Sequence, residues 1–335
     1  MSLLTVSGSP HVHTQQSVKS IMYGVVIAMI PAIFVSVYFF GLHAARVMFI
    51  SVLACLFFEW VIQKYLIKGP VTINDGSALV TGILLAFNVP SNLPAWIIVT
   101  GALVSIGIGK MSFGGLGKNP FNPALVGRVF LLISFPVQMT SWPVPKPLFG
   151  PGVTDAITGP TTLGIFKEGL DAGKTVQDIM ASPSFPGYIN DLVGAQSGSM
   201  GEISAIALLL GAVYMFSRKI ITWHIPVSYI GTAVVFSGIL WLIDPAHYID
   251  PVMHLLAGGM ILGVFFMATD MVSSPVSTKG QLVFGAGAGL LTILIRVWGA
   301  YPEGVSFAIL IMNAFTPLIN STFKPKRFGE VVKNG

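Results

Sequence analysis

The chain has very little charge and almost no cysteine. Its 335 residues include 18 Lys and Arg and 13 Asp and Glu, which is 9% charged, against about 25% in an ordinary soluble domain. So few charges cannot cover a water-facing surface, which excludes a soluble globular enzyme, a disordered chain and a nucleic-acid-binding module. The single cysteine, Cys55, lies in an apolar run. A disulfide framework and a cysteine-ligated zinc or iron–sulfur site within this chain are therefore excluded, and any redox role needs another cofactor.

Long apolar runs are what the chain has instead. Hydrophobic residues make up 53% of it and glycine a further 37 positions. A spanning helix needs about 20 mostly apolar residues, and about 15 serve inside a bundle. The sequence therefore predicts an all-α integral membrane protein of about ten transmembrane helices. We place them at residues 20–40, 44–63, 76–89, 94–108, 123–139, 203–216, 225–243, 253–268, 281–297 and 305–319.

The basic residues predict the orientation. With a cytoplasmic N-terminus, twelve of the 18 basic residues fall on the inner side of these spans, and the short outer loops receive only Arg46. Because cytoplasmic loops are rich in Lys and Arg, we expect both termini to be cytoplasmic. This topology also explains the net charge of +5 without a nucleic-acid partner. The first span follows a polar start with no small-residue cleavage signature, which favours a retained helix over a signal peptide.

The spans divide into two groups of five. We predict an N-terminal half at 1–140, an extracytoplasmic loop at 141–202, a C-terminal half at 203–320 and a cytoplasmic tail at 321–335. The halves share an N-x-F-x-P pattern at 119–123 and 313–317. Five spans per half would make the halves inverted repeats, a plan that places functional sites near the midplane, where helices are broken.

Polar and helix-breaking residues interrupt the apolar runs in four places, at 74–77, 88–92, 114–123 and 268–275. They read either as ordinary turns or as broken-helix backbone that lines a buried polar site. Charged residues also lie in or at the end of spans, namely Glu59, Arg128, Arg296 and Asp270. Such charges face a partner, a water cavity or the interface. Glu59 is the best candidate for an ion or proton site, whereas the arginines either snorkel, bind carbonyls or serve a function.

Other common chemistries find little support. Four histidines fall at predicted span ends (His43, His224, His247 and His254) rather than inside the bundle, which disfavours a bis-histidine haem. No HExxH, GxSxG or P-loop pattern is present, so a soluble-type hydrolase or nucleotidase is not expected. We predict neither a metal site nor a catalytic residue within the chain.

The most informative string is DAITGPTTL at 155–163. On its own it offers hydroxyls beside a Gly-Pro turn, as many polar turns do. It resembles the D-x-x-(S/T)-G-A-T signature at which a flavin transferase esterifies the phosphate of FMN to the last threonine. That signature occurs in the D subunit of Rnf ion-translocating oxidoreductases and in the related B subunit of sodium-translocating NADH:quinone oxidoreductases.

The resemblance covers nearly the whole chain. NPFNPA at 119–124 is similar to the family's loop before the fifth span. FMATDMVSSP at 266–275 is similar to its FMATDPVSSP segment, with Met271 where the family more often has Pro. At 335 residues without a long N-terminal extension, the chain is closer to the D-type member than to the longer B-type one.

The resemblance implies roles for individual residues. Thr161 is the expected FMN acceptor, Asp155 and Gly159 belong to the segment that the transferase reads, and Thr158 fills the Ser/Thr position. Pro160 stands where the family usually has Ala, and Thr162 is an alternative attachment point. The family also suggests a second, non-covalent flavin, riboflavin, among the spans. We expect Asn119 and Asn122 to supply polar contacts near it.

The implied function is that of an inner-membrane flavoprotein that relays electrons between ferredoxin and NAD, coupled to Na⁺ or H⁺ translocation. The chain has neither the cysteines for clusters nor a Rossmann G-x-G-x-x-G motif, so those cofactors must belong to partners. The resemblance implies the other Rnf subunits (A, B, C, E and G), including iron–sulfur and second FMN subunits, and a flavin transferase during maturation.

Three alternatives remain. The chain is also compatible with the B-type subunit of a quinone-reducing complex, with a cofactor-free channel or transporter for a small polar solute, and with a membrane scaffold. A channel would use the same inverted repeats and broken spans. A flavin that stays attached after denaturation would favour the flavoprotein assignment over a channel or a scaffold.

Overall fold

The computed structural model describes residues 16–145, 158–183, 185–194, 196–201 and 204–324. Its regular structure there is helical, with one isolated β-bridge between Pro143 and Thr158. Asp155, most of the predicted C-terminal tail and the start of the sixth predicted span lie outside the described residues. The longer helices are α1 (Val18–Val61), α2 (Ser77–Phe87), α3 (Ala95–Leu103), α4 (Pro123–Ser134), α6 (Thr162–Asp171), α9 (Ala205–Ser217), α10 (His224–Ile243), α13 (Thr278–Trp298) and α14 (Val305–Thr322).

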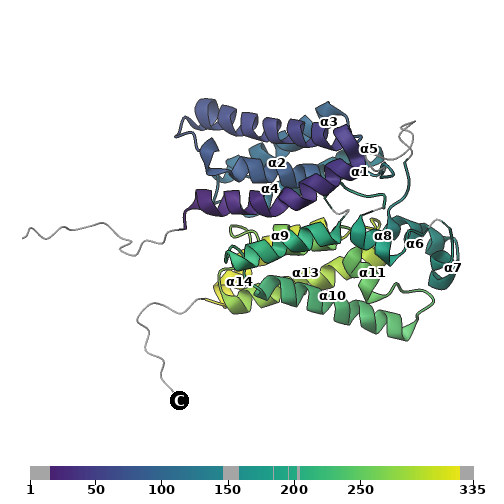
Figure 1. Cartoon of the computed structure of the whole chain (residues 1–335). Helices are drawn as coiled ribbons and strands as arrows, with labels where there is room; N and C mark the ends of the chain where they lie inside the picture. Colours follow the sequence, from purple (N-terminus) through teal and green to yellow (C-terminus); the bar gives the residue numbers. More distant parts are fainter. Residues whose placement is uncertain (1–15, 146–157, 184, 195, 202–203, 325–335) are drawn as a thin grey trace, which may run out of the picture.

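The first two predicted spans are the two legs of α1. Gly41 is its one residue with non-helical dihedral angles, φ 61° and ψ −147°, which only glycine adopts without strain. The chain reverses there, so that the second leg runs back beside the first (Figure 1). The π-helix η1 (Ile62–Ile67) continues the second leg. The two spans thus meet at a single residue, rather than through the short loop that the sequence predicts.

Several spans are broken, each for a local reason. α2 ends at Phe87 and is followed by an irregular stretch to Pro94 that contains Pro90. The predicted eighth span consists of α11 (Pro251–Leu256), α12 (Met260–Leu262) and the π-helix η5 (Gly263–Met267). Gly258 and Gly259 take positive φ between α11 and α12. The predicted fifth span ends as α4 at Ser134 and resumes as α5 (Pro136–Met139), because Pro136 cannot continue the helix.

The two halves lie side by side. α1 to α5 form one body and α9 to α14 another, with α1 against α9 between them (Figure 1). The contact is close because Gly211 of α9 has no side chain: a Cβ there would overlap the carbonyl oxygen of Ala28 in α1. Small residues at such crossings let helix backbones approach within a membrane.

Between the halves in sequence come three short helices, α6, α7 (Val176–Met180) and α8 (Tyr188–Val193). They have their own small apolar core, in which Leu163, Phe166 and Ile179 pack with Met253 of α11. They cover one end of the bundle, whereas α1 begins and α14 ends at the opposite end (Figure 1).

The all-α membrane fold predicted from the sequence is confirmed. Among the described residues, five helices are long and apolar enough to span a bilayer: Val18–Ile67, Ala95–Phe113, His224–Ile243, Thr278–Trp298 and Val305–Thr322. Shorter apolar helices occupy the third, fifth and sixth predicted spans. The inverted repeat stays a prediction.

Candidate functional site

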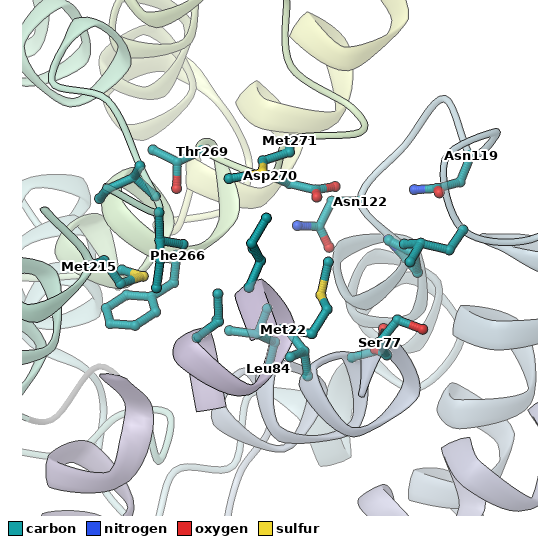
Figure 2. Close-up of a pocket in the computed structure, with 18 of the residues that line it drawn as sticks. Met22, Ser77, Leu84, Asn119, Asn122, Met215, Phe266, Thr269, Asp270 and Met271 are labelled. Atoms are coloured by element: carbon teal, nitrogen blue, oxygen red, sulfur yellow. Dashed lines mark hydrogen bonds between the residues drawn. The ribbon is translucent and has the colours of Figure 1, made fainter. Parts of the chain in front are cut away.

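A pocket lies between the two halves, near the end of the bundle where α1 begins. We call it the inter-half pocket. It has an empty volume of about 720 Å³ including its open mouth. Its apolar wall comes from both halves, with Met22 and Leu84 facing Met215 and Phe266 (Figure 2). Its polar lining is made by Ser77, Thr81, Lys110, Asn119, Asn122, Thr269 and Asp270.

Both asparagines singled out in the sequence line this pocket. Asn119 is 2% exposed, and its amide nitrogen donates to the carbonyl oxygen of Phe121 at 3.0 Å. That bond fixes the amide orientation and leaves the buried Oδ1 of Asn119 without a hydrogen-bond partner among the described residues. A buried acceptor left unpaired is costly. The pocket thus presents an acceptor that a ligand N–H or O–H would satisfy.

Asn122 caps the helix that begins at the pocket. Its Oδ1 accepts from the backbone N–H groups of Ala124 at 3.1 Å and Leu125 at 3.4 Å, at the start of α4. Its side-chain nitrogen donates to the carbonyl oxygen of Met267, at the end of η5, at 3.3 Å. Asn122 therefore ties a helix start of the first half to a helix end of the second.

The two N-x-F-x-P segments meet in the structure. With the Asn313 amide oriented to match its surroundings, its oxygen accepts from the N–H of Asn122 at 3.1 Å and its nitrogen donates to the carbonyl of Ser273 at 3.3 Å. Thr316 also donates to that carbonyl, at 2.9 Å. Asn88, which ends α2, donates to the sulfur of Met267 at 3.8 Å. The polar interruptions of both halves thus converge on the same region beside the pocket, rather than forming separate surface turns.

A buried ion pair adjoins the pocket, because one of its members, Lys110, is a lining residue. Lys110 Nζ is 2.7 Å and 2.9 Å from the two carboxylate oxygens of Glu59, and both side chains are at most 1% exposed. Lys110 also donates to Ser77 Oγ at 2.6 Å. The sequence places Lys110 among the charges of an inner loop; the structure instead buries it. Glu59, an acid in an apolar run, was the available signal, because a buried charge requires a partner.

The two arginines within spans are buried, and each binds groups of the protein. Arg128 of α4 forms an ion pair with Glu303 and hydrogen bonds with Ser306, both from the second half. Its Nε donates to the carbonyl of Asn88 at 3.3 Å. Arg296 of α13 donates to the carbonyls of Ala257 at 2.9 Å and Gly258 at 3.0 Å. It thereby satisfies backbone groups that the break between α11 and α12 leaves free.

The string at 155–163 forms the entry to α6 at the other end of the bundle. Thr158 pairs with Pro143 in the isolated bridge, and the N–H of Gly159 donates to the carbonyl of Trp142 at 2.9 Å. Thr161 is the N-cap of α6, and its Oγ1 accepts from the N–H of Gly164 at 3.1 Å. Asp155 lies outside the described residues.

Thr162 has a different environment. It is 2% exposed, and its Oγ1 lies 3.0 Å from Asp191 Oδ1 and 2.6 Å from Gln196 Oε1. Burial raises the pKa of Asp191 to about 6, although the hydrogen bond from Thr162 opposes the shift. Sequence reasoning missed Asp191 and Gln196, because nothing in the local pattern connects them to a threonine about 30 residues earlier.

Within the part of the chain that the structure describes, no three His, Cys, Asp or Glu side chains come together to hold a metal ion. Cys55 is buried and carries no disulfide.

Comparison with known proteins gives a single answer. The model of the NQR2, RnfD, RnfE family matches residues 5–329. The D subunit of the Na(+)-translocating ferredoxin:NAD(+) oxidoreductase complex of Acetobacterium woodii is 45% identical over 97% of this chain and 95% of its own length. Its proton-translocating counterpart from Clostridium ljungdahlii is 44% identical over 98% and 97%. The D subunit of the ion-translocating oxidoreductase complex of Cronobacter sakazakii is 38% identical over 97% and 98%.

Proposed function

The chain belongs to the NQR2, RnfD, RnfE family, and we infer from this that it is the D-type membrane subunit of an Rnf ion-translocating ferredoxin:NAD⁺ oxidoreductase. It is a multi-pass membrane protein that works within a complex of several subunits. The observation that carries the inference is similarity along nearly the full length of relatives that bear this name. One of these relatives is named for Na⁺ and the other for protons. We therefore propose that the coupling ion is either Na⁺ or H⁺.

We propose that Thr161 carries FMN through a phosphoester. An ester at this position places the phosphate at the N-terminus of α6, where free backbone N–H groups and the helix dipole stabilise negative charge. Thr162 is the less suitable acceptor, since its hydroxyl is already held between Asp191 and Gln196. Thr158 and Pro160, which precede Thr161, are exposed, whereas Thr161 itself is 6% exposed.

We further propose that the inter-half pocket holds the non-covalent flavin. An isoalloxazine ring has an apolar dimethylbenzene end and a polar pyrimidine end. The pocket matches that division, with Phe265 and Phe266 among its apolar residues and Asn119, Asn122 and Asp270 among its polar ones. The unpaired Oδ1 of Asn119 would accept the N–H of the pyrimidine end. The alternative of a cofactor-free channel gives this unpaired acceptor no fixed partner.

The two proposed flavin positions lie towards opposite ends of the bundle. Thr161 begins α6, which covers one end, whereas the pocket is lined by Ile21 and Met22 from the start of α1 (Figure 1). With the termini in the cytoplasm, the FMN lies on the extracytoplasmic side and the pocket on the cytoplasmic side. A flavin ring accepts one or two electrons and so links one-electron iron–sulfur centres to two-electron carriers. The chain would hold two redox centres of an electron-transfer path across the membrane.

Partners must supply the remaining centres. The one cysteine of the chain cannot hold a cluster. We therefore propose contacts with the iron–sulfur subunits and with the second FMN subunit of the complex, and with a flavin transferase during maturation. A quinone-reducing complex would need the same two flavin positions. Co-purification with a ferredoxin-like cluster protein favours the Rnf assignment over that one.

In-gel fluorescence of the denatured protein tests the covalent site. The wild-type chain, produced with a flavin transferase, is expected to fluoresce, and Thr161→Ala is expected to be dark. Thr175→Ala is a matched control, because Thr175 caps α7 in the same segment as Thr161 caps α6. It removes a comparable cap, about 1 kcal/mol, and should remain fluorescent. Fluorescence in Thr161→Ala with loss in Thr162→Ala would move the attachment point.

Acid extraction tests the pocket. Denaturation should release one flavin from the wild-type chain while FMN stays bound. Asn119→Leu is expected to lose the released flavin and keep the covalent one. Asn92→Leu is the control, because Asn92 also has a buried, unpaired Oδ1 but does not line the pocket. Equal release from wild type and Asn119→Leu would contradict the placement.

A further inference from the structure

A chain of short hydrogen bonds leads from the start of α2 to the inter-half pocket. Asp75 is partly exposed and precedes α2, next to the start of α1. Its Oδ1 accepts from Ser77 Oγ at 2.5 Å. Ser77 Oγ in turn accepts from Lys110 Nζ at 2.6 Å. Ser77 and Lys110 both line the pocket, and Figure 2 shows Ser77 among the lining side chains.

We propose that Asp75, Ser77 and Lys110 conduct protons from the end of the bundle at which α1 begins to the ligand of the inter-half pocket. We call them the Asp75–Lys110 path. The inference rests on the proposed flavin in that pocket, since the ring takes up a proton when a one-electron donor of a partner protein reduces it. It assigns to this chain the residues that supply that proton.

The three groups have the chemistry that conduction requires. A hydroxyl both donates and accepts, so Ser77 can pass a proton between the two groups that it contacts. The ammonium of Lys110 gives a proton to the ring and becomes an amine. Asp75, a carboxylate in the first state, takes a proton from water. Ser77 then accepts that proton from the Asp75 carboxyl while it donates its own to the amine of Lys110, which restores the carboxylate and the ammonium with one proton moved.

Glu59 explains how a lysine can serve at this depth. Burying a lone ammonium is costly, whereas the Glu59 carboxylate 2.7 Å away compensates the charge of Lys110. Glu59 is itself held by Gln63 at 3.2 Å, and Gln63 donates to Thr72 at 2.8 Å. This branch ends on Thr72 and does not enter the pocket. Glu59 therefore acts as a counter-ion, outside the path.

The neighbouring hydroxyl of Thr81 does not offer a second route. Thr81 lines the pocket one turn beyond Ser77, but its hydroxyl donates to the carbonyl of Ser77 at 2.9 Å. That bond ends on the backbone, which cannot relay a proton onward. Thr81 therefore lies outside the path.

The test is the rate of flavin protonation in the purified complex. The complex is reduced photochemically in weak buffer, and absorbance of the flavins and of a pH-indicator dye is followed together. The phase absent from Asn119→Leu is assigned to the pocket flavin. Ser77→Ala should slow proton uptake in that phase on the order of 100-fold, the usual contribution of a positioned proton donor. Asp75→Asn should slow it similarly. Ser77→Thr, which keeps the hydroxyl, should match wild type, and so should Thr72→Val, which lies on the Glu59 branch outside the pocket.

Chemical rescue of the slow variant distinguishes a loss of proton conduction from a structural disturbance of the pocket. A small weak acid such as formic acid, which can enter the pocket and deliver a proton directly, should restore the rate in Ser77→Ala. A wild-type rate in Ser77→Ala would overturn the path, and so would a slow rate that formic acid leaves unchanged. Absence of the assigned phase from the wild-type complex would instead overturn the flavin site, and the path with it.

Discussion

Arg128 of α4 and Glu303, which precedes α14, form a buried ion pair that joins the two halves of the chain. Both side chains are less than a tenth exposed. Arg128 also binds Ser306 and the carbonyl of Asn88, so that one guanidinium links α4, α14 and the end of α2. The two halves that line the inter-half pocket are therefore held in one fixed relation.

Removing one partner of this pair should be severe. Glu303→Gln leaves the guanidinium of Arg128 buried without its counter-ion, which in buried pairs costs about 3–5 kcal/mol. We expect a large fall in the thermal unfolding temperature of the detergent-solubilised chain. The double variant Arg128→Met with Glu303→Gln should lose less than the sum of the single losses. Additive losses would show that the two side chains do not act as a pair.

Substitution of Gly41 should disturb the α1 hairpin. The φ of 61° and ψ of −147° at this residue are strained for any residue with a Cβ. Gly41→Ala is expected to lower the free energy of unfolding by about 1–3 kcal/mol. Gly231→Ala is the control, because a Cβ at that helical position meets nothing within 4 Å. Comparison of the thermal unfolding temperatures tests this, and equal values would contradict the strain.

Gly211→Ala should separate the halves where α9 crosses α1. The new Cβ would overlap the backbone of Ala28, which can move only if the helices move apart. Met215 follows one turn later on α9 and lines the inter-half pocket. We therefore expect both a lower unfolding temperature and weaker retention of the extractable flavin. Retention of that flavin at the wild-type level would show that the pocket does not depend on this crossing.

Asp191 predicts a pH dependence of the segment that holds Thr161. Because burial raises its pKa to about 6, the folded chain retains a proton that the unfolded chain has lost between about pH 4 and pH 6. The stability contributed by Asp191 is present below that window and disappears as the pH rises through it. Asp191→Asn stays neutral throughout. It should therefore gain thermal stability over wild type as the pH rises from about 4 to about 7, and a constant difference would contradict the assignment.

The sequence predicted the apolar spans well and their breaks only in part. Length and hydropathy located the helices, because the bilayer demands about 20 apolar residues wherever the chain crosses. The meeting of Asn122 with Asn313 was beyond reach, since local pattern does not show which interruptions face each other. Lys110 was misplaced for a similar reason: a lysine beside a glycine-rich run looks like loop charge until its partner Glu59, 51 residues away, is known.

The candidate site was likewise predicted from the sequence only in part. The motif containing Thr161 was visible in the sequence, and so were the two asparagines that line the inter-half pocket. The different surroundings of Thr161 and Thr162 were not visible, because they depend on Asp191 and Gln196 folding back against Thr162.

Intact-mass measurement of the purified protein tests the central claim most directly. The chain, isolated from a host that has the flavin transferase, should exceed its sequence mass by the mass of FMN less one water molecule. The Thr161→Ala chain should show its sequence mass alone, while Thr175→Ala keeps the addition. A wild-type chain at its unmodified mass, or an addition that persists in Thr161→Ala, would contradict the attachment of FMN to Thr161.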